Sequence, residues 1–112
     1  MSRFEWETEV RRPVALVTVR GELDLRATAD LEPELERLAD EPGVDVVAVD
    51  LRELEFLDSS GLRLMVITAQ RLEECGRRLM LVRGAQAVQR VFEITRMTER
   101  LQFVDAPERG FN

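Results

Sequence analysis

The chain contains no histidine and no lysine, and it has a single cysteine among its 112 residues. Without histidine it has no Ser-His-Asp or Cys-His nucleophile system and no histidine metal ligand. Without lysine it has no Schiff-base lysine, no Walker lysine and no Ser-Lys dyad. The one cysteine, Cys75, allows no internal disulfide. These absences exclude the named nucleophile systems and histidine metal sites.

Charge and hydropathy argue against two further classes. The formal net charge is −6, which disfavours nucleic acid as a partner because phosphate contacts need a basic face. No apolar run approaches the roughly 18 residues that span a bilayer, and residues 1–7 lack the apolar region of a signal peptide. We therefore expect a cytoplasmic protein without membrane insertion. A lone thiol also suits the reducing cytoplasm.

The length and composition predict one α/β domain. Hydrophobic residues make up 45% of the chain and charged residues 34%, which is typical of a globular domain of this size. No repeat, low-complexity tract or linker interrupts it. We expect a single domain over residues 1–112, with an ordered core at about 4–105 and a frayed tail at 106–112. The expected architecture is a small mixed β-sheet packed with helices.

Alternation and apolar runs predict the first two strands. Residues 4–9 alternate apolar with acidic side chains, as in a half-buried edge strand. Residues 14–19 form a denser β-branched run, and residues 21–24 end it. The turn over residues 11–13 is too short for a crossover, so the two strands should be antiparallel.

A helical pattern follows, in which Leu31, Leu35 and Leu38 share one face. Pro33 lies inside this pattern and is tolerated in a first turn but not in a helix interior. We therefore expect the helix to start late or to kink at Pro33. Residues 41–43 end it.

The middle of the chain reads as strand, helix and strand. Residues 44–51 are nearly all apolar, as in a strand covered on both faces. A connector over residues 52–57 should carry Leu54 and Phe56 inward. A helix from about Ser59 to Glu74 follows, and it leads to a strand over residues 79–82 that should be parallel to the first.

The predicted C-terminal elements are shorter. Gly76 is the expected C-cap of the helix that begins at Ser59. Another helix starts at residues 84–85, Thr95 caps a last short helix, and residues 102–104 add an edge strand.

The segment over residues 56–62, Phe-Leu-Asp-Ser-Ser-Gly-Leu, places two hydroxyls and a carboxylate where a strand passes into a helix. The first helical turn has unpaired N–H groups and a positive dipole end, which favour a phosphate on Ser59. Gly61 would let a partner approach the backbone closely. Asp58, and Asp24 if the fold brings it near, would make the patch acidic. Ordinary capping by Asp58 or Ser59 explains the same residues, and the two interpretations are compatible.

Two other features have competing explanations. The first half of this helix is apolar almost all round, which indicates either a partner-binding patch beside Ser59 or burial on two sides. The apolar residues are Leu62, Leu64, Met65, Val66 and Ile67. Glu22 and Asp24 could be paired catalytic carboxylates, but a turn at the end of a strand explains them better.

The pairing of residues 21–24, Gly-Glu-Leu-Asp, with residues 56–62 resembles the bacterial anti-sigma factor antagonists, which are small single-domain STAS proteins. The likeness spans the chain from the first strand to Phe103. It implies that a serine-kinase anti-sigma factor phosphorylates Ser59, with Ser60 as the alternative. The bare antagonist would sequester the kinase and free a sigma factor, and a PP2C-type phosphatase would reset the phosphorylated form.

The resemblance also implies which residues meet the kinase. The expected partner-binding residues are Glu22, Asp24, Asp58, Ser59, Ser60, Gly61 and Leu62. Relatives often place a Gly-Leu pair after the third helix, where this chain has Arg96 and Met97. The alternative function is an unmodified STAS scaffold, such as an accessory subunit of a transporter or signalling complex. The resemblance also implies a protein that is not an enzyme and holds no cofactor or metal, since ATP and Mg²⁺ belong to the kinase. An enzyme with Ser59 as nucleophile is further disfavoured by the missing histidine and lysine.

Overall fold

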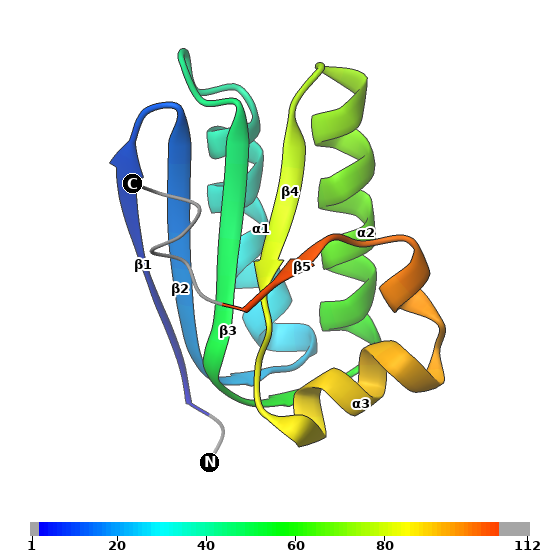
Figure 1. Cartoon of the computed structure of the whole chain (residues 1–112). Helices are drawn as coiled ribbons and strands as arrows, with labels where there is room; N and C mark the ends of the chain where they lie inside the picture. The colour runs from blue at the N-terminus through cyan, green and yellow to red at the C-terminus, as the bar shows by residue number, and fades with distance from the viewer. Residues whose placement is uncertain (1–2, 106–112) are drawn as a thin grey trace.

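The computed structural model describes residues 3–105, and Figure 1 shows its elements around one mixed sheet. The strands, in the spatial order β1-β2-β3-β4-β5, are β1 (Phe4–Arg11), β2 (Val14–Leu23), β3 (Val46–Leu57), β4 (Arg78–Val82) and β5 (Phe103–Val104). The helices are α1 (Leu25–Ala39), α2 (Ser59–Glu74), α3 (Gln86–Ile94) and the 3₁₀ turn η1 (Met97–Glu99). The first strand pair is antiparallel and the other pairs are parallel, so the predicted α/β class with one small mixed sheet is confirmed.

The hairpin of β1 and β2 follows the predicted pattern. Side chains of β1 alternate between half-buried and exposed, and Phe4 and Trp6 pack on the core. The strand lies at the edge of the sheet, and its antiparallel register runs from Phe4 opposite Gly21 to Arg11 opposite Val14.

The predicted connector over residues 52–57 is wrong, because β3 continues through it as far as Leu57. Leu54 is buried as expected, but Phe56 is 48% exposed rather than inward. The reason is a bulge: Gly21 pairs with Leu54 and Glu22 pairs with Phe56, which leaves Glu55 as an extra residue in β3. A bulge breaks the alternation of faces, so Leu57 takes the inward place and Phe56 turns out.

The expected late start of α1 is also wrong. Asp24 caps the helix, and the N–H of Thr28 donates to the carbonyl of Asp24 at 2.9 Å, so Pro33 lies in the interior of a helix that begins at Leu25. An interior proline costs about 3 kcal/mol. The leucine stripe predicted for this helix is at most 1% exposed, and each buried leucine contributes roughly 1.5–3 kcal/mol, which offsets the proline.

Helix α2 has the predicted bounds, Ser59–Glu74. Its cap residue is Cys75, and Gly76 follows in the left-handed conformation with φ +74°. The N–H of Arg77 donates to the carbonyl of Leu72, and that of Gly76 to the carbonyl of Glu73, which together form a Schellman motif. The helix connects β3 to β4, and these strands are parallel as predicted.

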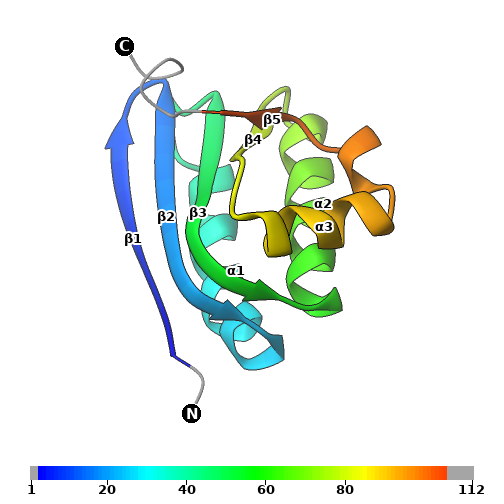
Figure 2. The ribbon, with the colours of Figure 1, turned by 60° about the horizontal axis from the view of Figure 1, so that its bottom comes forward.

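Helices α1 and α2 pack against each other along the sheet, while α3 packs against β3 (Figures 1 and 2). Thr95 ends α3 instead of capping another helix, and Arg96 takes the left-handed conformation with φ 62° before η1. Strand β5 confirms the predicted edge strand. The predicted tail at 106–112 lies outside the described residues. Within residues 3–105, no helix is long and apolar enough to cross a membrane.

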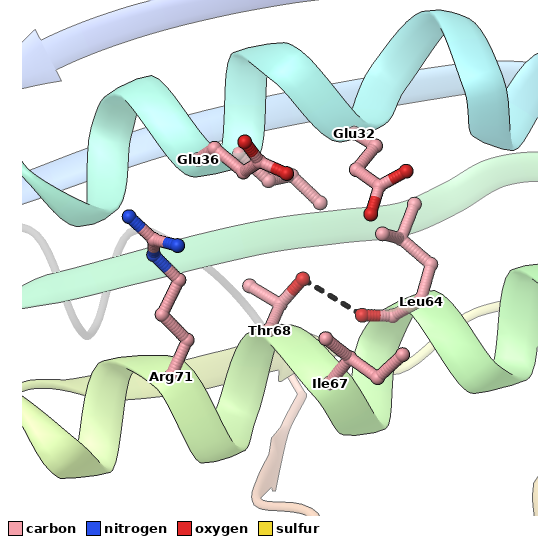
Figure 3. A pocket seen from close by; sticks show the side chains of 7 residues that line it. Glu32, Glu36, Leu64, Ile67, Thr68 and Arg71 are labelled. Carbon is pink, nitrogen blue, oxygen red and sulfur yellow. Dashed lines mark hydrogen bonds between the residues drawn. The ribbon is translucent and has the colours of Figure 1, made fainter.

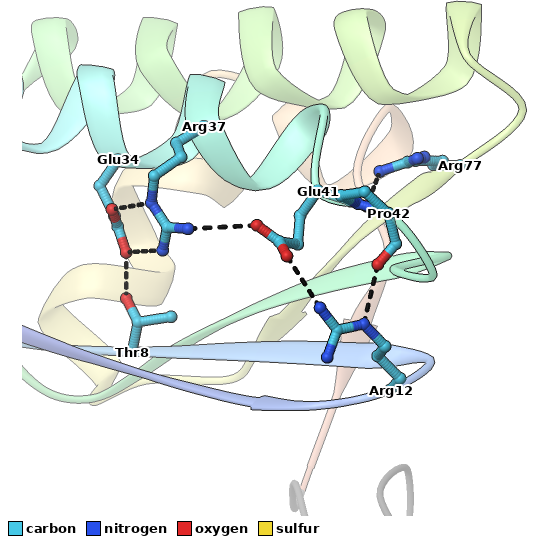
Figure 4. Close-up of polar contacts among 7 residues, drawn as sticks. All are labelled: Thr8, Arg12, Glu34, Arg37, Glu41, Pro42 and Arg77. Carbon is cyan, nitrogen blue, oxygen red and sulfur yellow. Dashed lines mark hydrogen bonds and ion pairs between the residues drawn. The ribbon is translucent and has the colours of Figure 1, made fainter.

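A polar network holds α1 over the hairpin at the end of the sheet where β1 turns into β2 (Figure 4). Thr8 donates to Glu34 at 2.7 Å, and Arg37 donates two hydrogen bonds of 2.9 Å to the same carboxylate. Arg12 binds the carboxylate of Glu41 and the carbonyl of Pro42, each at 2.8 Å. The Arg37 hydrogen bonds, assisted by Thr8, lower the pKa of Glu34 below its usual range.

Candidate functional site

Strands β2 and β3 end side by side, and each passes directly into a helix through an aspartate. Leu23 and Leu57 are the last pair of the parallel register, and the N–H of Asp58 donates to the carbonyl of Leu23 at 3.4 Å. Since α1 and α2 pack along each other, their N-termini lie at the same edge of the sheet, the lower edge in Figure 1. Asp24, which the sequence joined to Asp58 only if the fold brought it near, is thus the cap of the helix adjacent to that of Asp58.

The two aspartates have nearly the same backbone conformation, with φ −97° and ψ −172° at Asp24 and φ −104° and ψ −172° at Asp58. Asp24 accepts the N–H of Ala27 at 2.9 Å. Asp58 accepts the N–H groups of Ser60 at 2.9 Å and Gly61 at 3.2 Å. A cap of this kind contributes about 1 kcal/mol. Asp58, not Ser59, is therefore the cap of α2, and it already holds two of the N–H groups that we expected to receive a phosphate.

The two serines of the motif have different surroundings. Ser60 is half-buried, and its hydroxyl donates to Asp58. Ser59 is exposed, and its hydroxyl makes no hydrogen bond to any other residue between 3 and 105. Of the two hydroxyls, only that of Ser59 is both accessible and uncommitted.

Gly61 has a role that the sequence did not suggest. The residue is buried, and a Cβ there would lie 2.9 Å from both the Cγ and the carbonyl oxygen of Leu23, and 3.0 Å from Cδ1 of Leu57. The close approach that needs a glycine is therefore internal, between α2 and the end of β2. Packing inside the molecule thus explains the glycine at position 61 without the approach of a partner that we expected.

The apolar first half of α2 is buried on two sides, which was the second of our two explanations. Leu62 is 9% exposed, Leu64 5% and Met65 0%, because α1 covers one side of the helix and the sheet the other. Ile67 differs and is 40% exposed. Leu62 thus lies beneath the candidate surface rather than on it.

A groove separates the N-terminal halves of α1 and α2. It has a volume of about 310 Å³ and is lined by Leu25, Thr28, Glu32, Ser60, Arg63, Leu64 and Ile67. A smaller hollow continues along the two helices, with Glu32 and Glu36 on the α1 side and Ile67 and Arg71 on the α2 side (Figure 3). The groove therefore opens beside the serines, between an acidic and a basic wall.

Exposed apolar side chains gather around this end of the molecule. Leu25 is 71% exposed, Phe56 48% and Ile67 40%, and among the residues that the structure describes the only other large apolar side chain so exposed is Ile94. Sequence reasoning missed Leu25, although its position off the leucine stripe of α1 is a usable signal. Exposed apolar groups beside polar ones mark an interaction surface.

Glu22 is half-buried at the end of β2, opposite Phe56 in the register. Within the described part of the chain, no group of three acidic or cysteine side chains is placed to hold a metal ion. The arrangement offers a hydroxyl, several carboxylates and apolar contacts at one edge, which suits recognition by another protein.

Comparison with known proteins agrees with this description. The chain matches the STAS domain family over residues 5–108. The anti-sigma-B factor antagonist of Staphylococcus epidermidis is 30% identical over 92 residues, which cover 82% of this chain and 84% of that protein.

Two solved structures share the fold. The anti-sigma factor antagonist from Mycobacterium paratuberculosis superposes with a TM-score of 0.84 at 24% identity, over 96% of this chain and 90% of that one. The Bacillus cell fate determinant SpoIIAA in its phosphorylated form superposes with a TM-score of 0.72 at 22% identity, over 96% of each chain.

Proposed function

The chain belongs to the STAS domain family, of the anti-sigma factor antagonist type, and we propose that it is a phosphorylation-gated binding protein for a serine-kinase anti-sigma factor. In its bare form it binds the anti-sigma factor, which then releases its sigma factor. Phosphorylation of Ser59 by the same kinase ends the binding, and a PP2C-type phosphatase restores the bare form.

The exposed and unbonded hydroxyl of Ser59 carries this proposal. A kinase needs a serine oxygen that it can reach, and the hydroxyl of Ser60 is half-buried and already donates to Asp58. We therefore assign the modification to Ser59 and not to Ser60. The structural neighbour SpoIIAA has a phosphorylated form, which supports a modified state for this fold.

In the modification step, the Oγ of Ser59 forms a bond to the γ-phosphorus of ATP. The hydroxyl proton passes to a base of the kinase, and ADP departs as the P–O bond to the β-phosphate breaks. The kinase binds ATP and Mg²⁺ and positions both of them against the Ser59 hydroxyl. This chain contributes only the acceptor oxygen and the surface that docks the kinase.

The same surface explains why the modification weakens binding. Leu25, Phe56 and Ile67 supply apolar contact area, and the carboxylates of Glu22, Asp24 and Asp58 supply charge. A phosphoryl group adds about −1.5 to −2 charges among these groups. A hundredfold loss of affinity needs about 2.7 kcal/mol, which repulsion and lost contacts at the centre of an interface can provide.

Gly61 and Leu62 contribute to this surface from beneath. Both are buried, so Gly61 acts by letting α2 pack closely on Leu23, Leu62 acts by packing in the core, and neither acts by touching the kinase.

Calorimetric titration of the purified kinase tests the proposal. We expect Ser59→Ala to bind like the bare protein and Ser59→Asp to bind at least about tenfold more weakly, a loss of about 1.4 kcal/mol. Gln70→Glu is the matched control, because it adds the same charge at an exposed position of α2 about 16 Å along the helix. Equal affinity of the two Ser59 variants would contradict the switch.

Incubation with the kinase and ATP separates the two serines. We expect Ser60→Ala to be phosphorylated and Ser59→Ala to remain unmodified by intact-mass spectrometry. The opposite result would move the site to Ser60.

The second candidate function is a scaffold that binds without modification. The hydrogen bond from Ser60 to Asp58 favours it, because it gives one serine a structural role that needs no phosphoryl group. Intact-mass spectrometry of the protein from its native cell separates the two functions, since only the first predicts a phosphorylated fraction.

A further inference from the structure

The N-terminus of α2 has little capacity left to neutralise a phosphate on Ser59. Asp58 accepts the N–H groups of Ser60 and Gly61, and the N–H of Leu62 donates to the carbonyl of Asp58 at 3.1 Å. The aspartate also places a carboxylate directly next to Ser59. A phosphoryl group there needs a cation from elsewhere on the surface.

Arg63 is placed to be that cation. It follows Ser59 by four residues on α2, and both residues are exposed. Residues at this spacing are neighbours on a helix surface, with Cβ atoms about 5–6 Å apart. Long helical side chains also lean toward the N-terminus, which directs Arg63 at Ser59. An anion that precedes a cation by four residues is the favourable order.

The guanidinium of Arg63 has no competing ion pair. Between residues 3 and 105 no carboxylate lies within salt-bridge distance of it, whereas Arg71 on the same helix pairs with Asp40 at 3.1 Å. Arg63 instead lines the groove beside Leu25 and Ile67.

We propose that Arg63 receives the Ser59 phosphoryl group within the same chain, and that this ion pair draws the guanidinium from the wall of the groove toward the start of α2. The inference rests on the proposed function for the choice of Ser59. According to this inference, phosphorylation changes the surface at two places at once. Ser59 gains negative charge, and the groove loses the guanidinium of Arg63 from its basic wall.

The second pKa of the phosphoserine, ordinarily about 6, reports this contact. Asp58, Asp24 and Glu32, which lines the same groove as Arg63, raise that pKa because they disfavour the dianion. Arg63 and Arg26, which is exposed at the start of α1, lower it. The experiment therefore has to separate the two arginines.

Phosphoserine is installed at position 59 during translation, and the phosphorus resonance is followed through a pH titration. We expect Arg63→Gln to raise the second pKa by about 0.3 unit, the amount that a helical pair of this spacing provides. Arg71→Gln on the same helix should leave it unchanged. In the parent protein, the Nε–H resonance of Arg63 should move on phosphorylation.

An unchanged pKa in Arg63→Gln would overturn the inference, as would a shift found in Arg26→Gln instead. Because no kinase is used, this result is independent of the proposed function. If the native protein is never phosphorylated, the proposed function is wrong, but the contact between Arg63 and the installed phosphoserine still stands. If Arg63→Gln leaves the phosphoserine pKa unchanged, the contact is wrong, but the kinase assays still test the proposed function.

Discussion

Replacement of Gly61 by alanine separates the two roles that a glycine at this position can have. The new Cβ would lie 2.9 Å from the Leu23 carbonyl oxygen, 2.9 Å from the Leu23 Cγ and 3.0 Å from a methyl of Leu57. One of these contacts is with backbone at the end of β2, which is held by its pairing with β3. The side chains cannot relieve it alone, so α2 has to shift away from the sheet.

The net effect combines two opposing terms. Overpacking of a filled site costs about 1–3 kcal/mol. Alanine in place of glycine gains up to about 1 kcal/mol in a helix, and less in a first turn. We therefore expect Gly61→Ala to lower the free energy of unfolding by about 1–2 kcal/mol, which corresponds to a fall in Tm of roughly 4–8 °C.

Urea denaturation followed by circular dichroism measures this change. Gln70→Ala serves as the control, since it places alanine at an exposed position of the same helix and should change the free energy by less than about 0.5 kcal/mol. If Gly61→Ala were as stable as the parent and bound its partner more weakly, the packing argument would be refuted. Gly61 would then serve the partner's approach, as the sequence first suggested.

Two further predictions concern the rest of the fold. The lowered pKa of Glu34 means that its carboxylate stabilises the protein above its unfolded pKa of about 4.3, and that this contribution disappears as the pH falls through the lower, folded pKa. Glu34→Gln should therefore have a lower free energy of unfolding than the parent near neutral pH, and this difference should shrink when the pH falls below about 4.3. The same difference between variant and parent in urea denaturation at both pH values would contradict this. Arg96→Gly should raise the free energy of unfolding by about 0.5–1 kcal/mol. A non-glycine residue at φ 62° costs about 1–2 kcal/mol, and the greater conformational entropy of glycine in the unfolded chain cancels part of the relief. An unchanged or lower Tm would show that the Arg96 side chain contributes contacts that offset its backbone conformation.

Local signals in the sequence were enough to predict those elements whose ends are marked by capping or turn residues or whose side chains alternate. The bounds of α2 follow from the aspartate and serines before it and from Gly76 after it, and the structure agrees at both ends. The edge position of β1 follows from its alternation. Arg96 takes the left-handed conformation, in which glycine is favoured.

Features set by contacts between distant segments were not predictable from local patterns. The orientation of Phe56 depends on a bulge that exists only because β3 pairs with β2 out to Leu57. The start of α1 before Pro33 depends on burial of its leucines against the sheet. Likewise, the groove exists only where α1 and α2 meet, so Arg63 had no visible role in the sequence.

The location of the candidate site could be predicted from the sequence, but the different surroundings of its two serines could not. The sequence put Asp58 and both serines together and left the place of Asp24 to the fold, and the paired ends of β2 and β3 bring Asp24 to the same edge of the sheet. It did not distinguish the two hydroxyls, because that difference arises from which one Asp58 binds. The side-chain geometry of a single helical turn decides it.

The cap at Asp58 also separates the modification from the stability of the fold. A phosphate at an uncapped helix start would bond to free N–H groups and stabilise the helix. Here the aspartate already holds the N–H groups of Ser60 and Gly61, so a phosphoryl group on Ser59 would gain little from the backbone. Its charge would remain at the surface, at the edge of the sheet where Leu25 and Phe56 are exposed and where the proposed partner would approach. A site built in this way converts a covalent change mainly into a change of affinity, because the phosphoryl group would add little to the stability of the helix beyond the ion pair with Arg63.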